Sequence, residues 1–111
     1  HNMICLAFAS VDGVSKVGYF AGSSSSQTFD IGFTPRMLLL RQVTAQNNHW
    51  YLMDTTRGWS SGNDNFLKLD SNVAQVNYEM GAPTTTPKGF TVPTGTGINS
   101  AGETTIYYAH A

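Results

Sequence analysis

The clearest pattern along the chain is the alternation of apolar and polar positions that is typical of β-strands. It is sharpest over residues 28–33, where Phe29, Ile31 and Phe33 fall on one face and the residues between them on the other. Glycine, serine, threonine and asparagine interrupt every stretch that is long enough for a helix, and no apolar stripe with helical spacing is sustained. The pattern therefore predicts strands and no substantial helix.

One run differs from the others because it is apolar at every position. Arg36 and Arg41 enclose Met37–Leu40, and a continuous apolar run of this length is typical of a strand that is covered on both faces. We expect this strand to lie near the centre of a sheet. The other expected strands are Met3–Ala9, Lys16–Phe20, Thr28–Phe33, His49–Asp54, Asn65–Asp70, Val73–Met80, Gly89–Val92 and Thr104–Ala111.

Turn-forming residues separate these runs at short intervals. They comprise Asp12–Gly13, Ser23–Ser26, Asn47–Asn48, Ser61–Asp64 and Gly95–Gly97. Eight or nine short strands at this spacing predict an all-β fold, an antiparallel and jelly-roll-like sandwich of two sheets, with a barrel as the alternative. Ala82–Pro87 holds two prolines and no large apolar residue, so we expect a surface crossover there.

The two ends of the chain share a short motif. Ile4–Ala9 and Ile106–Ala111 both follow the pattern Ile-x-x-Ala-x-Ala, at a separation close to one domain length. We expect residues 1–111 to form a single module. One interpretation of the shared motif is that residues 1–14 of it are the closing strand and linker of a preceding tandem copy. The alternative is a chance match of six residues.

Length and charge narrow the class of function. A chain of 111 residues has the size of one domain. Six basic residues against seven acidic ones give a net charge of −1, too weak a field to attract nucleic acid. No apolar run approaches the roughly 18 residues of a membrane span, so no membrane insertion is expected. A single cysteine, Cys5, excludes an internal disulfide and a zinc site of paired cysteines.

No set of residues is typical of catalysis. The only imidazoles are His1, His49 and His110, no Gly-x-Ser-x-Gly motif is present, and no pair of carboxylates stands out. Gly62–Asn65 and Asp70 offer oxygen ligands but lack the alternating pattern of a calcium loop, which favours a plain turn. We expect no enzymatic activity, no metal and no cofactor.

Aromatic residues supply the one candidate binding site. Trp50, Tyr51 and Trp59 can form a platform on which sugar rings stack, beside the amide side chains of Asn47 and Asn48. Trp50 and Tyr51 are consecutive in an expected strand, so their side chains point to opposite faces. The alternative is that these rings belong to the core or to an interface between chains.

Several segments in order resemble a known family. They are Ala7–Gly18, Gln27–Phe33, Trp50–Gly58, Gly62–Leu69, Gly89–Phe90, Ile98–Gly102 and Ile106–Ala111. Together they resemble a β-rich module of bacteriophage tail fibres and related virion structural proteins, over nearly the whole chain. The resemblance implies a β-sandwich in long, usually trimeric fibres of the virion, often in more than one copy, with copies of itself and other virion proteins as partners. It supplies no catalytic residue.

These observations lead to one expected function and one alternative. We expect a non-enzymatic structural module of a phage tail fibre, spike or capsid-attached fibre that self-associates through sheet faces or edges. Charged residues are only 12% of the chain, which favours close packing between copies. The alternative is a receptor-binding module that contacts host-surface glycans through the aromatic and amide residues named above.

Overall fold

The computed structural model describes residues 7–44, 49–69, 75–94 and 97–111, which form nine strands and no helix. The strands are β1 (Ser15–Ala21), β2 (Gln27–Asp30), β3 (Met37–Gln42), β4 (Tyr51–Asp54), β5 (Asp64–Lys68), β6 (Val76–Tyr78), β7 (Ala82–Thr85), β8 (Lys88–Val92) and β9 (Thr104–His110). Because the described part holds no helix, it holds none that is long and apolar enough to cross a membrane.

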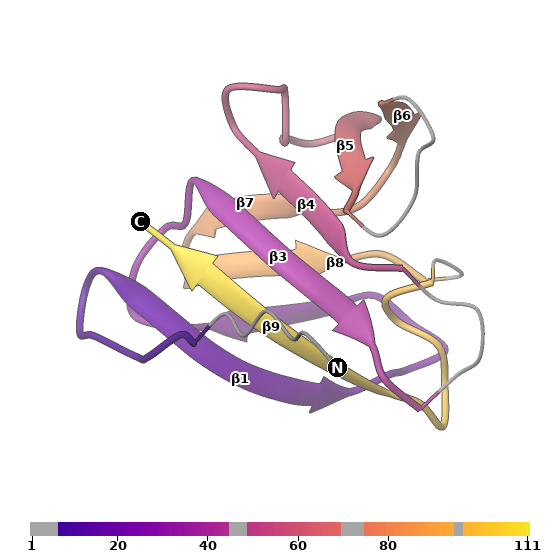
Figure 1. Cartoon of the computed structure of the whole chain (residues 1–111), viewed down its shortest axis with the longest axis horizontal. Helices are drawn as coiled ribbons and strands as arrows, with labels where there is room; N and C mark the ends of the chain where they lie inside the picture. The colour runs from indigo at the N-terminus through magenta and orange to yellow at the C-terminus, as the bar shows by residue number, and fades with distance from the viewer. Residues whose placement is uncertain (1–6, 45–48, 70–74, 95–96) are drawn as a thin grey trace, which may run out of the picture.

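The strands form two antiparallel sheets of unequal size (Figure 1). The larger has six strands in the order β1-β9-β3-β4-β5-β6, and the smaller has three in the order β2-β8-β7. The smaller sheet lies behind the larger one, so the molecule is a two-layer sandwich. The expected all-β sandwich of eight or nine short strands is confirmed.

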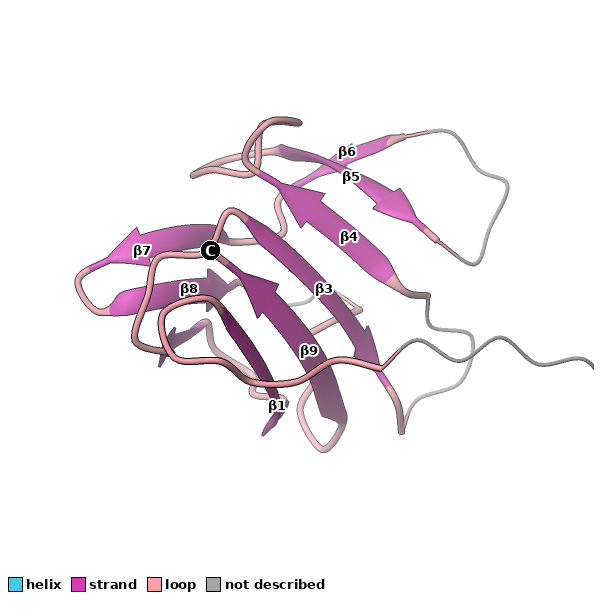
Figure 2. Ribbon diagram, turned by 60° about the vertical axis from the view of Figure 1, so that its left-hand side comes forward, coloured by secondary structure: helices cyan, strands magenta, loops and turns pink. Residues whose placement is uncertain are grey.

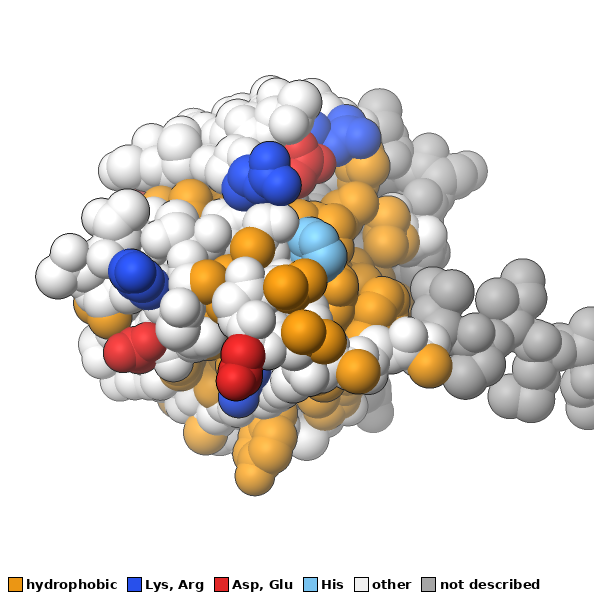
Figure 3. Space-filling model, turned by 90° about the vertical axis from the view of Figure 1, so that its left-hand side faces the viewer, with side chains coloured by type: hydrophobic (Ala, Val, Ile, Leu, Met, Phe, Trp, Pro, Cys, Tyr) orange, Lys and Arg blue, Asp and Glu red, His pale blue; other side chains and the backbone are white. Residues whose placement is uncertain are grey.

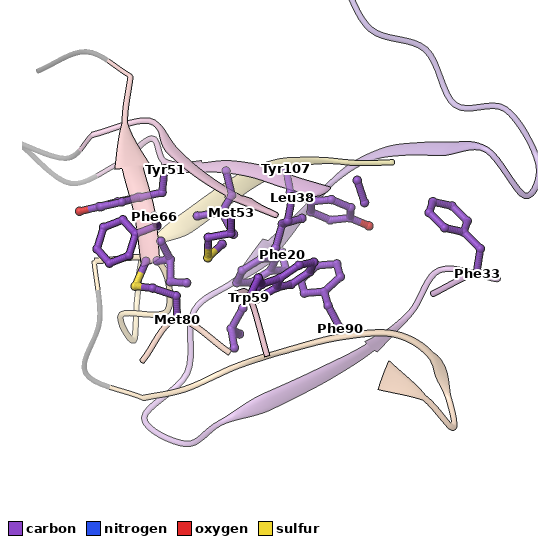
Figure 4. Packing of buried hydrophobic residues seen from close by; sticks show 14 residues of the cluster. Phe20, Phe33, Leu38, Tyr51, Met53, Trp59, Phe66, Met80, Phe90 and Tyr107 are labelled. Atoms are coloured by element: carbon purple, nitrogen blue, oxygen red, sulfur yellow. The ribbon is translucent and has the colours of Figure 1, made fainter. Parts of the chain in front are cut away.

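The hydrophobic core lies between the sheets. On the inner face of the larger sheet, Leu38, Leu40 and Met53 are fully buried, and the smaller sheet contributes Phe90 and Val92. Figure 4 shows Leu38 and Met53 packed among aromatic rings from both layers, including Phe90 of the smaller sheet. Burial of this apolar area is the main force that holds the two layers together.

The run between the two arginines forms a central strand, as predicted. β3 pairs with β9 on one side and with β4 on the other. Leu38 and Leu40 face the core, while Leu39, on the opposite face, is also buried, with 9% of its surface exposed. The apolar run is therefore covered on both faces.

Two expectations about strand boundaries were wrong for local reasons. β2 ends at Asp30, because Gly32 adopts a φ of +86° and its N–H donates to Asp30 Oδ1 at 3.1 Å, which makes a turn. Ala82–Thr85, expected in a crossover, forms strand β7 instead. Pro83 is tolerated there because β7 is an edge strand, where a missing N–H need not break a ladder.

The N-terminal strand expected at Met3–Ala9 lies mostly outside the described residues. Its described part, Ala7–Ala9, is not a strand but an exposed segment. The backbone carbonyl of Ala9 accepts a hydrogen bond from Ser15 Oγ at 2.8 Å. The hydroxyl of Ser10 accepts one from the N–H of Val17 at 3.0 Å. The segment is thus attached to β1 of its own module.

Gly89 gives a stability prediction, because a Cβ at this position would lie 1.7 Å from the backbone oxygen of Phe29 in the paired strand β2. We expect Gly89→Ala to lower the free energy of unfolding by about 2–4 kcal/mol, since a backbone atom cannot move aside as a side chain can. Urea unfolding measures the change. The control is Gly102→Ala, where φ is +83° but the space is open, with an expected loss of about 1–2 kcal/mol. Equal losses for the two variants would contradict the close approach of β2 and β8.

Candidate functional site

The candidate site is the face of the six-stranded sheet that turns away from the smaller sheet, called here the outer face. The strand register aligns its side chains in rows that run across the strands. The middle row consists of Val17, Tyr108, Leu39, Leu52 and Leu67, one from each of β1, β9, β3, β4 and β5. Each is the register partner of the next, so a continuous apolar row crosses five strands of the sheet.

A mixed row lies on one side of the middle row. Tyr19 pairs with Ile106, and Ile106 pairs with Arg41. The guanidinium carbon of Arg41 lies 5.7 Å from the centre of the Trp50 ring, which continues the row onto the next strand. We call this the Arg41 row.

A more polar row lies on the other side. Ser15 pairs with His110, His110 with Met37, and Met37 with Asp54. The hydroxyl of Tyr108 in the middle row lies 2.9 Å from Nδ1 of His110, which joins the two rows. We call this the Asp54 row.

The N-terminal segment, residues 7–14, crosses part of the outer face. The ring of Phe8 stacks on that of Tyr108, with 4.4 Å between the ring centres. Figure 2 shows this segment passing in front of β1 and β9. Phe8 therefore adds a second apolar layer above the middle row.

The outer face and the N-terminal segment leave several large apolar side chains in solvent. Tyr19 is 77% exposed, and Phe8, Val11, Val14 and Val17 are between 41% and 51% exposed. For side chains of this size, these fractions correspond to roughly 500 Å² of surface. Figure 3, which faces the left-hand end of the molecule in Figure 1, shows exposed hydrophobic side chains there with a few charged side chains among them. A patch of several hundred Å² often marks an interaction site.

Charge is sparse on this face. Alternation along the six strands places one cation, Arg41, and one carboxylate, Asp54, on the outer side. Asp54 Oδ2 lies 3.0 Å from Nε of Arg57, and Asp54 Oδ1 accepts the backbone N–H of Arg57 at 2.8 Å. These contacts fix the turn that follows β4.

The structure does not bring the predicted sugar-stacking rings together. Tyr51 points into the core with 9% of its surface exposed, and Trp59 is buried with 1% exposed, so neither offers a free ring face. The backbone N–H of Trp59 donates to the carbonyl of Asp54 at 3.0 Å, which closes the turn that precedes the buried ring. Trp50 alone lies on the outer face, half-buried beside Arg41. Asn47 and Asn48 lie outside the described residues.

The acidic turn before β5 has a structural role. Asp64 is buried, and its two oxygens accept the backbone N–H groups of Ser60 at 2.7 Å and Met80 at 3.1 Å. Both oxygens are thus used to hold backbone, and Asp70 lies outside the described part of the chain. In the ranges that the structure describes, no three His, Cys, Asp or Glu side chains are close enough to hold a metal ion.

Sequence reasoning did not single out Tyr19, Ile106 or Phe8. A signal was present, because residues 19–20 and 106–108 carry apolar side chains at consecutive positions, on both faces of a strand. Such strands need cover on both sides, and here the smaller sheet covers one side.

Asp64 predicts a pH dependence of stability. Burial raises the pKa of the Asp64 carboxyl above its usual 3.8, although the two backbone N–H groups act in the opposite direction. The folded state then holds this proton to a higher pH than the unfolded state. The contribution of Asp64 to the free energy of unfolding therefore falls as the pH rises from about 3.8 through the raised pKa.

Urea unfolding of the wild type and Asp64→Asn, measured between pH 3 and pH 7, tests this dependence. The stability of the wild type relative to Asp64→Asn should decrease with rising pH. Asp12→Asn, which removes an exposed carboxylate, is the matched control. A relative stability that increases with pH would mean that the two N–H groups outweigh burial.

Trp59 gives a second stability prediction, because its indole fills the core although its Nε1–H meets no acceptor among the described residues. Trp59→Ala should lower the free energy of unfolding by about 3–5 kcal/mol by opening a cavity. Trp59→Phe keeps most of the packing and removes the unpaired donor, so it should cost less than about 2 kcal/mol. Thermal or urea unfolding compares the two, and a small effect of Trp59→Ala would place the ring outside the core.

Comparison with known proteins gives a family and no further match. No curated protein and no solved structure matches the chain. A family model described as Domain of unknown function (DUF7483) matches residues 1–111, the full length of the chain. The chain therefore belongs to the DUF7483 family.

Proposed function

We propose that this chain is a non-enzymatic structural module of a bacteriophage virion, in a tail fibre, spike or capsid-attached fibre, and that it self-associates through its outer face. The observation that carries the self-association is the exposed apolar surface on the outer face and the segment that crosses it, which consists of Tyr19, Val17, Phe8, Val11 and Val14. The virion assignment draws on the family resemblance of the sequence.

The exposed apolar area has the size that an interface needs. A standard interface covers roughly 800 Å² on each partner, and a little over half of that surface is apolar. The roughly 500 Å² left open by Tyr19, Phe8 and the three valines supplies an apolar share of this size. A second copy of the chain presents the same surface, so the area suits self-association.

The sheet edges favour contact through the face. On the edge of β1, the N–H of Val17 donates to Ser10 Oγ, and Ser15 and Val11 exchange backbone hydrogen bonds. β6 at the other edge has three residues, and the edge strand β7 contains Pro83. Capped, short or proline-containing edges are poor templates for strand addition. We therefore assign self-association to the face and not to the edges.

The composition is consistent with an assembly of many copies. With 12% charged residues and a net charge of −1, copies repel one another little when they pack closely. A chain with one cysteine forms no internal disulfide, so in a particle outside the cell its stability would rest on apolar burial within and between copies. The glycan-binding alternative rests on Trp50 among the described aromatic candidates, since the rings of Tyr51 and Trp59 are buried.

Sedimentation velocity over a range of concentrations tests the self-association. We expect the wild type to form assemblies larger than the 12.0 kDa monomer. Tyr19→Ser should weaken them about tenfold or more, because a large exposed ring is removed from the contact surface. Tyr78→Ser is the matched control, since Tyr78 is 56% exposed on the edge strand β6 and should have no effect.

A wild type that stays monomeric at every concentration would contradict the self-association, and equal effects of the two serine variants would contradict its assignment to the outer face.

Mass spectrometry of purified phage particles tests the virion assignment separately. The chain should be present in particles of a phage that encodes it, and its absence from them would overturn that part of the proposal.

A further inference from the structure

Arg41 is the one cation that the described strands place on the outer face, and its Nε–H has no acceptor there. The Nε–H of Arg41 is buried and meets no acceptor in the part of the chain that the structure describes. The guanidinium lies over the Trp50 ring, and Ile106 is its register neighbour. The side chain of Arg41 is half-exposed, so the other N–H groups of its guanidinium can donate to an oxygen supplied by a docking partner.

The outer face also contains a suitable acceptor, in the opposite row. Asp54 is the one carboxylate that the strands place on this side of the sheet. Each of its oxygens contacts Arg57, at 2.8 and 3.0 Å. A carboxylate oxygen has two lone pairs, so both oxygens can accept a further hydrogen bond. Arg41 cannot reach the Asp54 of its own chain. The middle row lies between the Arg41 row and the Asp54 row, and each row is two residues along the strand from the next.

We propose, building on the self-association proposed above, that Arg41 of one copy pairs with Asp54 of the next. The copies are related by a two-fold or three-fold axis that runs along the middle row. Rotation about this axis keeps each strand at its position along the row and brings one side of the row against the opposite side of the next copy. The Arg41 row of one copy then faces the Asp54 row of the next, while the middle rows, with the Phe8 rings stacked above them, lie nearest the axis.

The strand order makes the pairing geometrically reasonable. Under this rotation, Arg41 of β3 comes opposite Met37 of the same strand in the next copy. Met37 is the register partner of Asp54 on β4, and adjacent strands lie about 4.8 Å apart. The long arginine side chain can span one strand spacing to reach the carboxylate.

This pairing would determine how the copies are oriented. If the axis ran along the strands instead, the Arg41 row would face itself and bring like charges together. Apolar contacts alone do not distinguish the two arrangements, because they have little directional preference. Arg41 and Asp54 are thus inferred to be the specificity-determining residues of the interface.

Arg41→Met tests the pairing because the two models predict opposite signs. Methionine has a similar length and no charge. If Arg41 pairs with a second copy, the substitution should weaken association at least tenfold in sedimentation velocity. If Arg41 only borders the interface, the outer face of Arg41→Met is more apolar than that of the wild type, and the variant should associate as strongly as the wild type or more strongly. That result would overturn the proposal. Arg41→Lys keeps the charge but loses the planar fork, so it should give an intermediate loss.

Charge reversal identifies the partner residue. Arg41→Glu and Asp54→Lys should each weaken association, and the double variant should restore at least part of it. Far-UV circular dichroism and thermal unfolding confirm that each variant is folded, which matters for Asp54 because of its bonds to Arg57. No restoration by a folded double variant would rule out the Arg41–Asp54 pair.

The outcomes separate this inference from the function on which it rests. A monomeric wild type removes both. A wild type that assembles, is disrupted by Tyr19→Ser and is unaffected or strengthened by Arg41→Met retains the self-association and overturns only the pairing.

Discussion

Apolar side chains on both faces of a sheet require both faces to be covered from solvent. In this chain, the second sheet covers only one face of the six-stranded sheet. In β3 and β9, the inner residues Leu38 and Ala109 are fully buried, and the outer positions carry apolar Leu39 and Tyr108. The three-stranded sheet covers the inner side, and the ring of Phe8 covers Tyr108 on the outer side. Tyr19 remains largely exposed. This imbalance determines where the core lies and which surface is left to contact another molecule.

The unequal number of strands also explains the position of Trp59. Three strands cannot cover six, and in Figure 1 the strands β5 and β6 extend beyond the smaller sheet. Trp59 from the loop after β4 and Met80 from the segment after β6 join the core cluster that includes Phe66 of β5. They supply apolar volume where further strands of the second sheet would otherwise be needed. The same requirement removes the Trp59 ring from the surface.

The sequence predicted what local patterns determine. The apolar run of β3, the strand expected at Lys16–Phe20 and the opposite orientations of Trp50 and Tyr51 follow from neighbouring positions. Pro83 misled the prediction because a proline is excluded from a central strand but tolerated at an edge, and strand order is a non-local property. Trp59 lies in a loop, where no periodicity indicates burial. The outer face was missed because consecutive apolar residues indicate cover on two sides without indicating whether one chain supplies it.

Exposed side chains such as Tyr19 contribute little to the stability of a single chain, so folding alone does not account for their size and apolar character. Solubility would favour polar residues there. The β1 edge beside them is capped by Ser10 and Val11, which hinders strand addition but leaves the face open. An apolar row supplies contact area without direction, whereas one cation and one carboxylate on opposite sides of that row supply direction at low net charge. The two features are complementary, and together they suit a surface that must associate in one defined orientation.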